Sequence, residues 1–400
     1  MNSPLLPVDE VVEYLLQNVE CTAGSTVRNL DDALGRYLSR DIHSPVNVPP
    51  APNSSMDGYA FDARDKSIVI GGVYEISDRI PAGQVGRMLE PGTLVRIFTG
   101  APMPEGADTV VIQEDTTRVG NRIQINNLPE PGENVRPRGQ DIRQDSVILS
   151  RGRCLRSEDL GLAASVGLSE LDIFKPLKIA IMSTGDELVE PPGKLAPGQI
   201  YNANRYALAG MLHGLGMEVI DLGLVADTQE ATRDVILKGA GLSDCILCSG
   251  GVSVGEEDHV RAAVESLGTL DIWRLAIKPG KPLAFGQVEG KPFFGLPGNP
   301  VSTYVTFMMI ARPFLIALQG GCDPLPVCYY GRADFNYQTG NRREYLRVRI
   351  VTNTSGEVYL HKFHNQGSGI MSSVSWADAL AEVETGQQVR AGDLLKYYLI

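Results

Sequence analysis

The chain has 400 residues, of which 48 are acidic and 36 basic, so its formal charge is −12. A single hydrophobic core rarely extends past roughly 250–300 residues, which predicts two or more domains. The acidic balance argues against broad nucleic-acid binding, because that activity needs clustered lysine and arginine. The sequence contains no run of about 18 apolar residues, so it predicts no membrane span. The nearest candidate, residues 304–318, is interrupted by Arg312 and Pro313.

The compartment expected from the sequence is the cytoplasm. Six cysteines in 400 residues are too sparse for a disulfide scaffold. No basic segment precedes Asp9 and Glu10, so the first residues do not resemble a signal peptide. Cys245 and Cys248 lie in a predicted strand that would point them to opposite faces, and no second pair exists. We therefore interpret both as buried apolar residues rather than as zinc ligands.

The first part of the chain predicts a helical region that is interrupted by a β-rich insert. Apolar residues from Val8 to Val19 recur with helical spacing, and Leu30 to Leu38 carry a second helical stripe. Prolines and glycines then separate short strands at residues 93–98, 109–112 and 123–125, before a helical pattern returns at residues 155–166. The expected domains are a helical one over residues 1–45 and 144–175 and a β-rich one over residues 46–143.

Residues 176–322 alternate short apolar runs with helical patterns. Strands are expected at residues 178–182, 218–222, 244–248, 272–277, 283–285 and 292–296. Helices are expected at residues 204–215, around 235–236, at 256–267 and from 301 onward. This alternation predicts a mostly parallel, doubly wound sheet with helices on both faces. Residues 323–400 return to strands, such as 345–351 and 358–360, and predict a small β-barrel or sheet domain.

Three glycine-rich loops follow strands of this predicted sheet, at the carboxyl ends where open α/β sheets bind ligands. They are STGDEL at 183–188, SGGVSVG at 249–255 and GLPGNPVS at 295–302. Glycine lets backbone N–H groups approach an anion, and a helix start adds a positive dipole end. Asn299 fits a helix N-cap and Pro300 the first helical position. Tight turns alone would explain the glycines of one loop, but three such loops with hydroxyls favour an anion site.

Acidic residues lie in or beside these loops. Asp186, Glu187 and Asp258 would repel a phosphate that they faced directly, whereas carboxylates at phosphate sites commonly recruit Mg²⁺. Asp227, after the second strand, could join them. The alternatives are that Asp258 is a first-turn helix charge and that Asp227 caps a turn.

Two further groups of polar residues are candidates. Lys278 and Lys281 lie in the rigid turn KPGKP at 278–282, which favours binding of phosphate or another oxyanion. In the β-rich region, Asp57, Thr99 and Asp141 lie in dense polar loops. Each of these loops, taken alone, fits a structural turn as well as it fits a site.

Taken together, these segments resemble the MoeA family of molybdopterin molybdenumtransferases, which is related to the E domain of gephyrin. The matches run in the family's order across nearly the whole chain: SMDGYA at 55–60, TGAP at 99–102, RGQDI at 138–142, STGDEL, SGGVSVG, KPGKP and GLPGNPVS. The resemblance implies a multidomain fold of α/β plus β type in an elongated homodimer. Its domains would be a central doubly wound sheet domain of molybdopterin-binding type, a β-rich insert, a small helical N-terminal domain and a C-terminal β-barrel-like domain.

The resemblance also implies an activity, the insertion of molybdate into adenylylated molybdopterin with release of AMP and dependence on Mg²⁺. The dithiolene sulfurs of the pterin are the soft ligands that take the metal. In the family, the active site lies between the sheet domain of one subunit and the β-rich domain of the other. The implied partners are a molybdopterin adenylyltransferase and acceptor molybdoenzymes, with neither nucleic acid nor membrane.

The site residues that the resemblance implies fall into three groups. Catalytic roles are expected for Asp57, Thr99, Asp141, Asp186, Glu187, Asp227 and Asp258, with Mg²⁺ held by Asp186, Glu187 and Asp258. Substrate contacts from the glycine-rich loops are expected at Ser183, Thr184, Gly185, Ser249, Gly250, Gly251, Ser253, Gly255, Pro297, Gly298, Asn299, Pro300 and Ser302. Further substrate contacts are expected at Lys278, Lys281, Arg342, Arg347 and Ser368.

Two other functions remain open at the level of sequence. A molybdopterin adenylyltransferase would use the same sheet domain, and a non-enzymatic scaffold of the gephyrin kind would use the same fold. The matched motifs in the β-rich and C-terminal domains favour insertion over adenylylation. The intact acidic residues argue against a scaffold that has lost catalysis.

Overall fold

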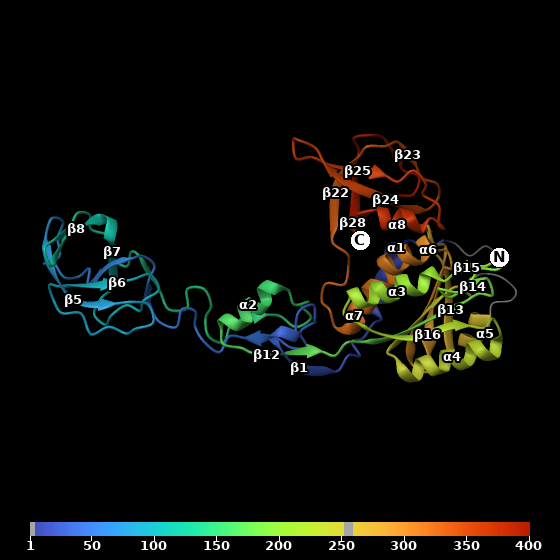
Figure 1. Cartoon of the computed structure of the whole chain (residues 1–400), viewed down its shortest axis with the longest axis horizontal. Coiled ribbons are helices and arrows are strands. Elements are labelled where there is room, and N and C mark those ends of the chain that lie inside the picture. Colours follow the sequence, from blue (N-terminus) through green and yellow to red (C-terminus); the bar gives the residue numbers. More distant parts are fainter. Residues whose placement is uncertain (1–4, 252–258) are drawn as a thin grey trace.

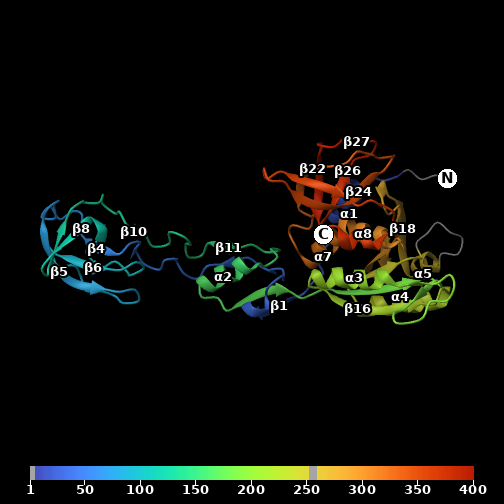
Figure 2. The ribbon, with the colours of Figure 1, turned by 45° about the horizontal axis from the view of Figure 1, so that its top comes forward.

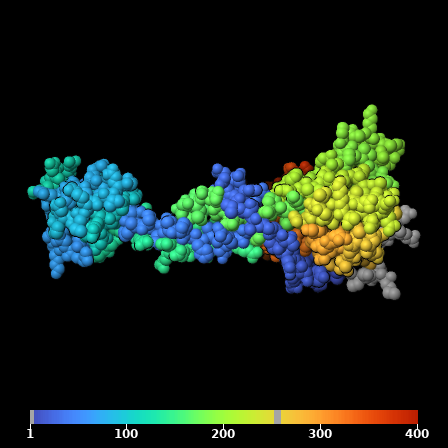
Figure 3. All heavy atoms as spheres, turned by 90° about the horizontal axis from the view of Figure 1, so that it is seen from below, coloured from blue at the N-terminus to red at the C-terminus, as the bar shows by residue number. Residues whose placement is uncertain are grey.

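The protein is elongated, with its structural units in a row (Figure 1). The computed structural model describes residues 5–251 and 259–400. A β-rich unit lies at one end, a small mixed unit lies in the middle, and an α/β unit with a β-barrel beside it forms the other end. The space-filling view shows the β-rich unit well separated from the α/β unit (Figure 3). The glycine-rich loops of the α/β unit therefore lie far from the β-rich unit of the same chain.

The β-rich unit is a six-stranded sheet in the order β7-β4-β6-β5-β9-β8. Its strands are β4 (Gly58–Phe61), β5 (Val73–Ile80), β6 (Leu94–Ile97), β7 (Thr109–Ile112), β8 (Thr116–Val119) and β9 (Arg122–Ile125). The predicted strands at 93–98, 109–112 and 123–125 are confirmed as β6, β7 and β9. Leu94 and Val95 belong to different apolar clusters, because successive side chains of a strand point to opposite faces. A separate pair, β3 (Asn53–Ser54) with β10 (Val135–Arg136), lies where the chain enters and leaves this unit.

The middle unit contains one helix and two strand pairs. β1 (Ser25–Asn29) pairs with β12 (Glu170–Phe174), and β2 (Ile42–His43) pairs with β11 (Val147–Leu149). Helix α2 (Ser157–Ser165) confirms the pattern at 155–166. The predicted second helix at 30–38 is wrong, since only the 3-10 helix Leu30–Asp32 forms there. Gly35 has a positive φ of 71°, and Tyr37 and Leu38 instead form β-bridges to distant segments, so tertiary pairing overrides the helical spacing.

The α/β unit is built on a mixed sheet in the order β16-β13-β17-β21-β20-β18. Its strands are β13 (Lys178–Thr184), β16 (Glu218–Val225), β17 (Cys245–Ser249), β18 (Gly268–Arg274), β20 (Pro282–Val288) and β21 (Lys291–Leu296). The first four strands of this order are parallel, and the last two run antiparallel to their neighbours. Cys245 and Cys248 are fully buried in β17 and pack into different apolar clusters, as expected from the sequence.

Helices cover both faces of this sheet, in agreement with the prediction (Figure 2). One face carries α1 (Val8–Gln17), α3 (Ala203–Gly214), α6 (Pro300–Thr306) and α7 (Arg312–Gln319), and the other carries α4 (Gln229–Leu242) and α5 (His259–Leu267). Thus α1 forms where it was predicted, but it packs on the α/β unit rather than in the middle unit.

The segment from α6 to α7 is one continuous helical run, because a π-helical turn, Phe307–Ala311, accommodates Pro313. Among the described residues, Pro300–Gln319 is the one helix long and apolar enough to cross a membrane, with a mean hydropathy of 1.6. Because 78% of its apolar window is buried inside the fold, this helix is part of the protein core.

The C-terminal unit is a closed β-barrel. Its strands are β22 (Cys328–Ala333), β24 (Arg343–Thr352), β25 (Val358–Lys362), β26 (Ala379–Val383) and β28 (Leu394–Leu399), and pairing of β24 with β26 closes it. A pair of short strands, β23 (Tyr337–Gln338) and β27 (Gln388–Val389), and helix α8 (Met371–Trp376) flank the barrel. One short strand of the α/β unit, β19 (Ile277–Lys278), adds to β24. The barrel is therefore hydrogen-bonded to a loop of the α/β unit.

Substitution Leu15→Ala tests whether α1 belongs to the α/β core. Leu15 is buried in the same apolar cluster as Leu315 of α7, so its truncation should lower the free energy of unfolding by about 2–5 kcal/mol. Leu34→Ala is the matched control, because Leu34 is 59% exposed and its change should stay within about 0.5 kcal/mol. Chemical denaturation measures both values, and equal effects would contradict the packing of α1.

Candidate functional site

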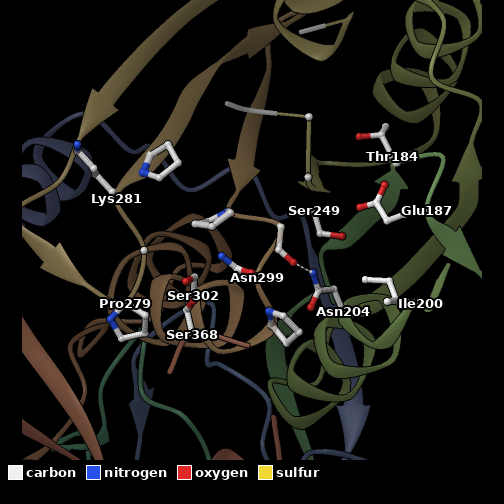
Figure 4. A pocket seen from close by; sticks show the side chains of 18 of the residues that line it. Thr184, Glu187, Ile200, Asn204, Ser249, Pro279, Lys281, Asn299, Ser302 and Ser368 are labelled. Carbon is white, nitrogen blue, oxygen red and sulfur yellow. Dashed lines mark hydrogen bonds between the residues drawn. The ribbon is translucent and has the colours of Figure 1, made fainter. Parts of the chain in front are cut away.

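A cavity of about 770 Å³ lies at the carboxyl ends of β13, β17 and β21 (Figure 4). The predicted residues that line it are Thr184, Gly185, Glu187, Asp227, Ser249, Gly250, Gly251, Lys278, Lys281, Pro297, Gly298, Asn299, Pro300, Ser302, Arg342 and Ser368. In Figure 4, Thr184 and Glu187 lie on one side of the cavity and Pro279 and Lys281 on the other, with Ser249 and Asn299 between them. The three glycine-rich loops therefore converge as the sequence predicts.

Hydroxyl groups line the floor of the cavity where β13 and β17 end. The Ser249 Oγ is 3.0 Å from the Ser183 Oγ, so these two strand ends are joined by a hydrogen bond. Ser183 itself is buried beneath the cavity and does not line it. The Thr184 Oγ1 is buried and has no hydrogen-bond partner among the described residues. A buried polar atom without a partner costs about 1–3 kcal/mol, and Thr184 is the one residue with such an atom that also lines the cavity, among those the structure describes.

Gly250 is required at its position by both its conformation and its surroundings. Its φ is +92°, a region that other residues rarely adopt. A Cβ atom on Gly250 would lie 2.8 Å from the Thr184 carbonyl oxygen. The backbone of the second loop can therefore pass close to the first loop only because residue 250 has no side chain.

The third loop leads into α6. As predicted, Asn299 is the N-cap residue of α6 and Pro300 lies in its first turn, although the Asn299 side chain makes no capping hydrogen bond. Instead, the Asn204 Nδ2 donates to the Gly298 carbonyl oxygen at 2.7 Å, the bond that Figure 4 shows as a dashed line. Asn204, at the start of α3, was not predicted, because no local pattern distinguishes it from an ordinary helix residue.

The acidic residues divide into those that line the cavity and those that do not. Glu187 and Asp227 line it, whereas Asp186 is exposed and lies outside the lining. Asp258, like Ser253 and Gly255, lies outside the described residues. Within residues 5–251 and 259–400, no group of three or more His, Cys, Asp or Glu side chains is placed to hold a metal ion without further ligands. Of the three expected magnesium ligands, Glu187 lines the cavity, Asp186 does not, and Asp258 is not among the described residues.

The cations come from both the α/β unit and the barrel. Lys278, Lys281 and Arg342 line the cavity, and the Arg342 guanidinium donates to the Ile277 carbonyl oxygen at 3.2 Å. Arg347, in contrast, is buried away from the cavity, and burial lowers the pKa of its guanidinium to about 10. Its guanidinium donates to the Ser373 hydroxyl and to the Tyr345 and Gly367 carbonyls. Arg347 therefore supports the loop of Ser368 rather than contacting a ligand.

Asp57, Thr99 and Asp141 lie in or next to the β-rich unit, away from the cavity of their own chain (Figure 1). The Asp57 Oδ1 accepts hydrogen bonds from both the backbone N–H and the hydroxyl of Thr99, each at 2.8 Å. These two bonds lower the pKa of the Asp57 carboxyl from its ordinary value. Asp57 and Thr99 thus form one local unit, and Asp141 is exposed outside it.

Substitution Gly250→Ala should abolish anion binding in the cavity, because a methyl group would meet the Thr184 carbonyl. We expect the affinity for inorganic pyrophosphate to fall at least about tenfold, the equivalent of about 1.4 kcal/mol. Gly198→Ala is the matched control, since Gly198 has a φ of +87° with nothing within 4 Å of its Cβ position. Isothermal titration calorimetry measures both variants, and an equal loss in the control would attribute the effect to backbone strain alone.

Substitution Thr99→Val should raise the pKa of the Asp57 carboxyl toward its ordinary value, because the hydroxyl donor is lost while the backbone donor remains. A lowered pKa in the folded state means that the Thr99–Asp57 interaction stabilises the fold above the unfolded-state pKa and is lost as the pH falls through the folded-state pKa. Carbon NMR of the carboxyl group measures the shift. An unchanged titration would show that the hydroxyl does not act on Asp57.

Comparison with known proteins agrees with this arrangement. Three family models match the chain in order: the MoeA N-terminal region (domain I and II) over residues 6–167, the probable molybdopterin binding domain over residues 180–317, and the MoeA C-terminal region (domain IV) over residues 332–400. Together they span nearly all of the chain.

Similar proteins cover almost the same length. The molybdopterin molybdenumtransferase of Haemophilus influenzae is 36% identical over 375 residues, which is 92% of each chain. That of Nostoc sp. is 33% identical and covers 94% of this chain and 89% of its own. A crystal structure of the MoeA protein of a Pyrococcus species superposes with a TM-score of 0.80 at 30% identity over 99% of both chains. The chain therefore belongs to the MoeA family of molybdopterin molybdenumtransferases.

Proposed function

We propose that the chain inserts molybdenum from molybdate into adenylylated molybdopterin and releases AMP, and that it does so in the cavity beyond β13, β17 and β21. The observation that carries the proposal is the Thr184 hydroxyl, which is buried in the wall of that cavity and has no partner in the part of the chain that the structure describes. Such a group is satisfied when a polar ligand binds. Membership of the family supports molybdopterin and molybdate as the ligands.

Different walls of the cavity suit different parts of these substrates. Gly250 and Gly251 have no side chains, so a phosphate group can come close to the main-chain N–H groups there. Lys278, Lys281 and Ser302 offer charged and neutral donors to an oxyanion such as molybdate. The protein thus neutralises and orients the phosphoanhydride that is cleaved, while the dithiolene sulfurs of the pterin provide the soft ligands for molybdenum.

Magnesium is part of the proposal, and the donor set fits it. Mg²⁺ in phosphate sites usually takes one or two protein carboxylates and completes its shell with substrate phosphates and water. Glu187 and Asp227 are two carboxylates on the cavity wall, and they would otherwise repel an anionic substrate. When bound there, the ion would supply positive charge to the phosphates.

The active form is proposed to be a homodimer. Asp57 and Thr99 lie at the opposite end of the chain from the cavity, so within one chain they cannot act on a ligand bound there. In a two-fold dimer the β-rich unit of one copy can cover the cavity of the other. We locate the reaction in the cytoplasm, with a molybdopterin adenylyltransferase as the supplier of substrate and molybdoenzymes as acceptors of the product.

Release of AMP from adenylylated molybdopterin tests the proposed reaction directly. With Mg²⁺ and molybdate present, the chain should release AMP and form active cofactor, and omission of either ion should stop the reaction. Release without molybdate would indicate a hydrolase. Tight binding of the adenylylated pterin without release would indicate a scaffold or carrier.

Substitution Asp227→Asn should lower the rate of AMP release by about 100-fold or more, because a proposed carboxylate ligand of the Mg²⁺ at the reacting phosphates is lost. Asp234→Asn is the control, since this carboxylate lies on α4 with 67% of its side chain exposed. Steady-state kinetics measures both variants. Full activity of Asp227→Asn would remove Asp227 from the site.

Mixing two inactive variants tests the homodimer. If Asp57 serves the cavity of the other copy, a heterodimer of Asp57→Asn with Asp227→Asn contains one intact site. Equal mixing and subunit exchange should then restore about a quarter of the wild-type activity. A mixture that stays inactive while heterodimers form would contradict a shared active site.

A further inference from the structure

Lys278 of the cavity wall is joined to an acidic residue of the C-terminal barrel. The Lys278 Nζ lies 3.0 Å from the Glu344 Oε1. The two residues are register partners in the β19–β24 pairing, so the backbone holds them together as well. Lys278 is half-exposed and lines the cavity, whereas only 5% of the Glu344 side chain is exposed. Lys278 thus belongs to the cavity wall, while the carboxylate that its ammonium binds is buried in the barrel.

Tyr337, another residue of the barrel unit, binds the Glu344 carboxylate. The Tyr337 hydroxyl donates to the Glu344 Oε2 at 2.6 Å, so each carboxylate oxygen has its own donor. Burial and the neighbouring Glu344 carboxylate raise the pKa of Tyr337, which keeps its hydroxyl protonated as a donor. Glu344 therefore has little freedom to move, and the same holds for the nitrogen it binds.

Stability alone is a poor reason for this arrangement. A half-exposed ion pair contributes only about 0–1 kcal/mol, while burying a carboxylate carries a desolvation cost that its hydrogen bonds have to offset. The barrel contains a comparable group that is away from the cavity: Glu382 is 3% exposed, lies 3.6 Å from the Lys396 Nζ, and accepts from two tyrosine hydroxyls. Glu382 and its partners do not line the cavity, which makes it a matched reference.

We propose that Glu344 is a positioning residue for the oxyanion substrate, holding the Lys278 ammonium at the cavity wall, with Tyr337 fixing Glu344. An ammonium has three donors, so Lys278 can bind Glu344 and still offer two donors to molybdate. This inference rests on the proposed function, because it takes molybdate as the anion beside Lys278. It makes strand β24 of the barrel a part of the oxyanion site.

A double-mutant cycle with Lys278→Ala and Glu344→Ala tests this role. The Kd for sodium molybdate, measured by equilibrium dialysis, and the KM for molybdate in AMP release are the readouts. Each single substitution should raise both constants about tenfold, and kcat should change less. The double variant should bind no more weakly than Lys278→Ala, because Glu344 acts through that lysine. Additive losses in the double variant would overturn the proposal.

Conservative and control variants separate positioning from a merely structural role. Glu344→Gln keeps an oxygen that accepts from Lys278, so its Kd for molybdate should equal or fall below that of the wild type. Tyr337→Phe, the variant to use if Glu344→Ala does not fold, should raise the Kd about threefold. Glu382→Ala should leave it unchanged. A loss in Glu344→Gln as large as in Glu344→Ala, or an equal loss in Glu382→Ala, would refute the role of Glu344.

The two proposals fail in different ways. Wild-type protein that releases no AMP in response to molybdate contradicts the proposed function, whatever the variants do. Wild-type protein that responds to molybdate, with a Kd that Glu344→Ala leaves unchanged in a folded variant, contradicts only the positioning role.

Discussion

The in-register ends of three parallel strands are the constraint on which the site depends. Ser183 of β13 pairs with Ser249 of β17, and Ser249 pairs with Leu296 of β21. Parallel strands lie about 4.8 Å apart, so three loops that leave them at one level must begin side by side. Because Gly250 has no side chain, the second loop can pass close to the backbone of the first loop. A slip of one strand would separate the loops and turn their side chains to the other face.

The barrel is the second half of this cavity rather than an appended module. It supplies Arg342 and the loop of Ser368 to the lining, and it binds β19 of the α/β unit through backbone pairing. The Val301 N–H at the start of α6 donates to the Ser368 carbonyl oxygen at 2.9 Å. An anion in the cavity would thus meet charges from two units that are joined through several hydrogen bonds. Relative motion of barrel and α/β unit would change the site itself.

Unlike the barrel, the β-rich unit contributes nothing to the cavity of its own chain, because the molecule is elongated. Its Asp57 carboxylate accepts two hydrogen bonds from Thr99 that lower its pKa, but it lies at the far end of the molecule from the cavity of the same chain. The hydrogen-bonded arrangement of Asp57 and Thr99 has a function if these residues complete the cavity of a second copy of the chain. In such a dimer, the narrow middle unit sets the distance and the direction between the Asp57–Thr99 unit and the cavity of the same chain.

The sequence by itself determined the local features: the strands of the α/β sheet to within a few residues, several strands of the other units, most helices, and the three loops whose glycines, prolines and hydroxyls predict an anion site. These follow from spacing and backbone chemistry within a few residues. Tertiary structure alone decided where α1 packs, that residues 30–38 are not a helix, and that Arg347 supports a loop. It also decided that Asn204 lines the cavity and that Glu344 binds both Lys278 and Tyr337. Each of these depends on contacts between segments far apart in the chain, such as the 66 residues between Lys278 and Glu344. The spacing of residues within one segment does not predict such contacts, because they form only when packing brings distant segments together.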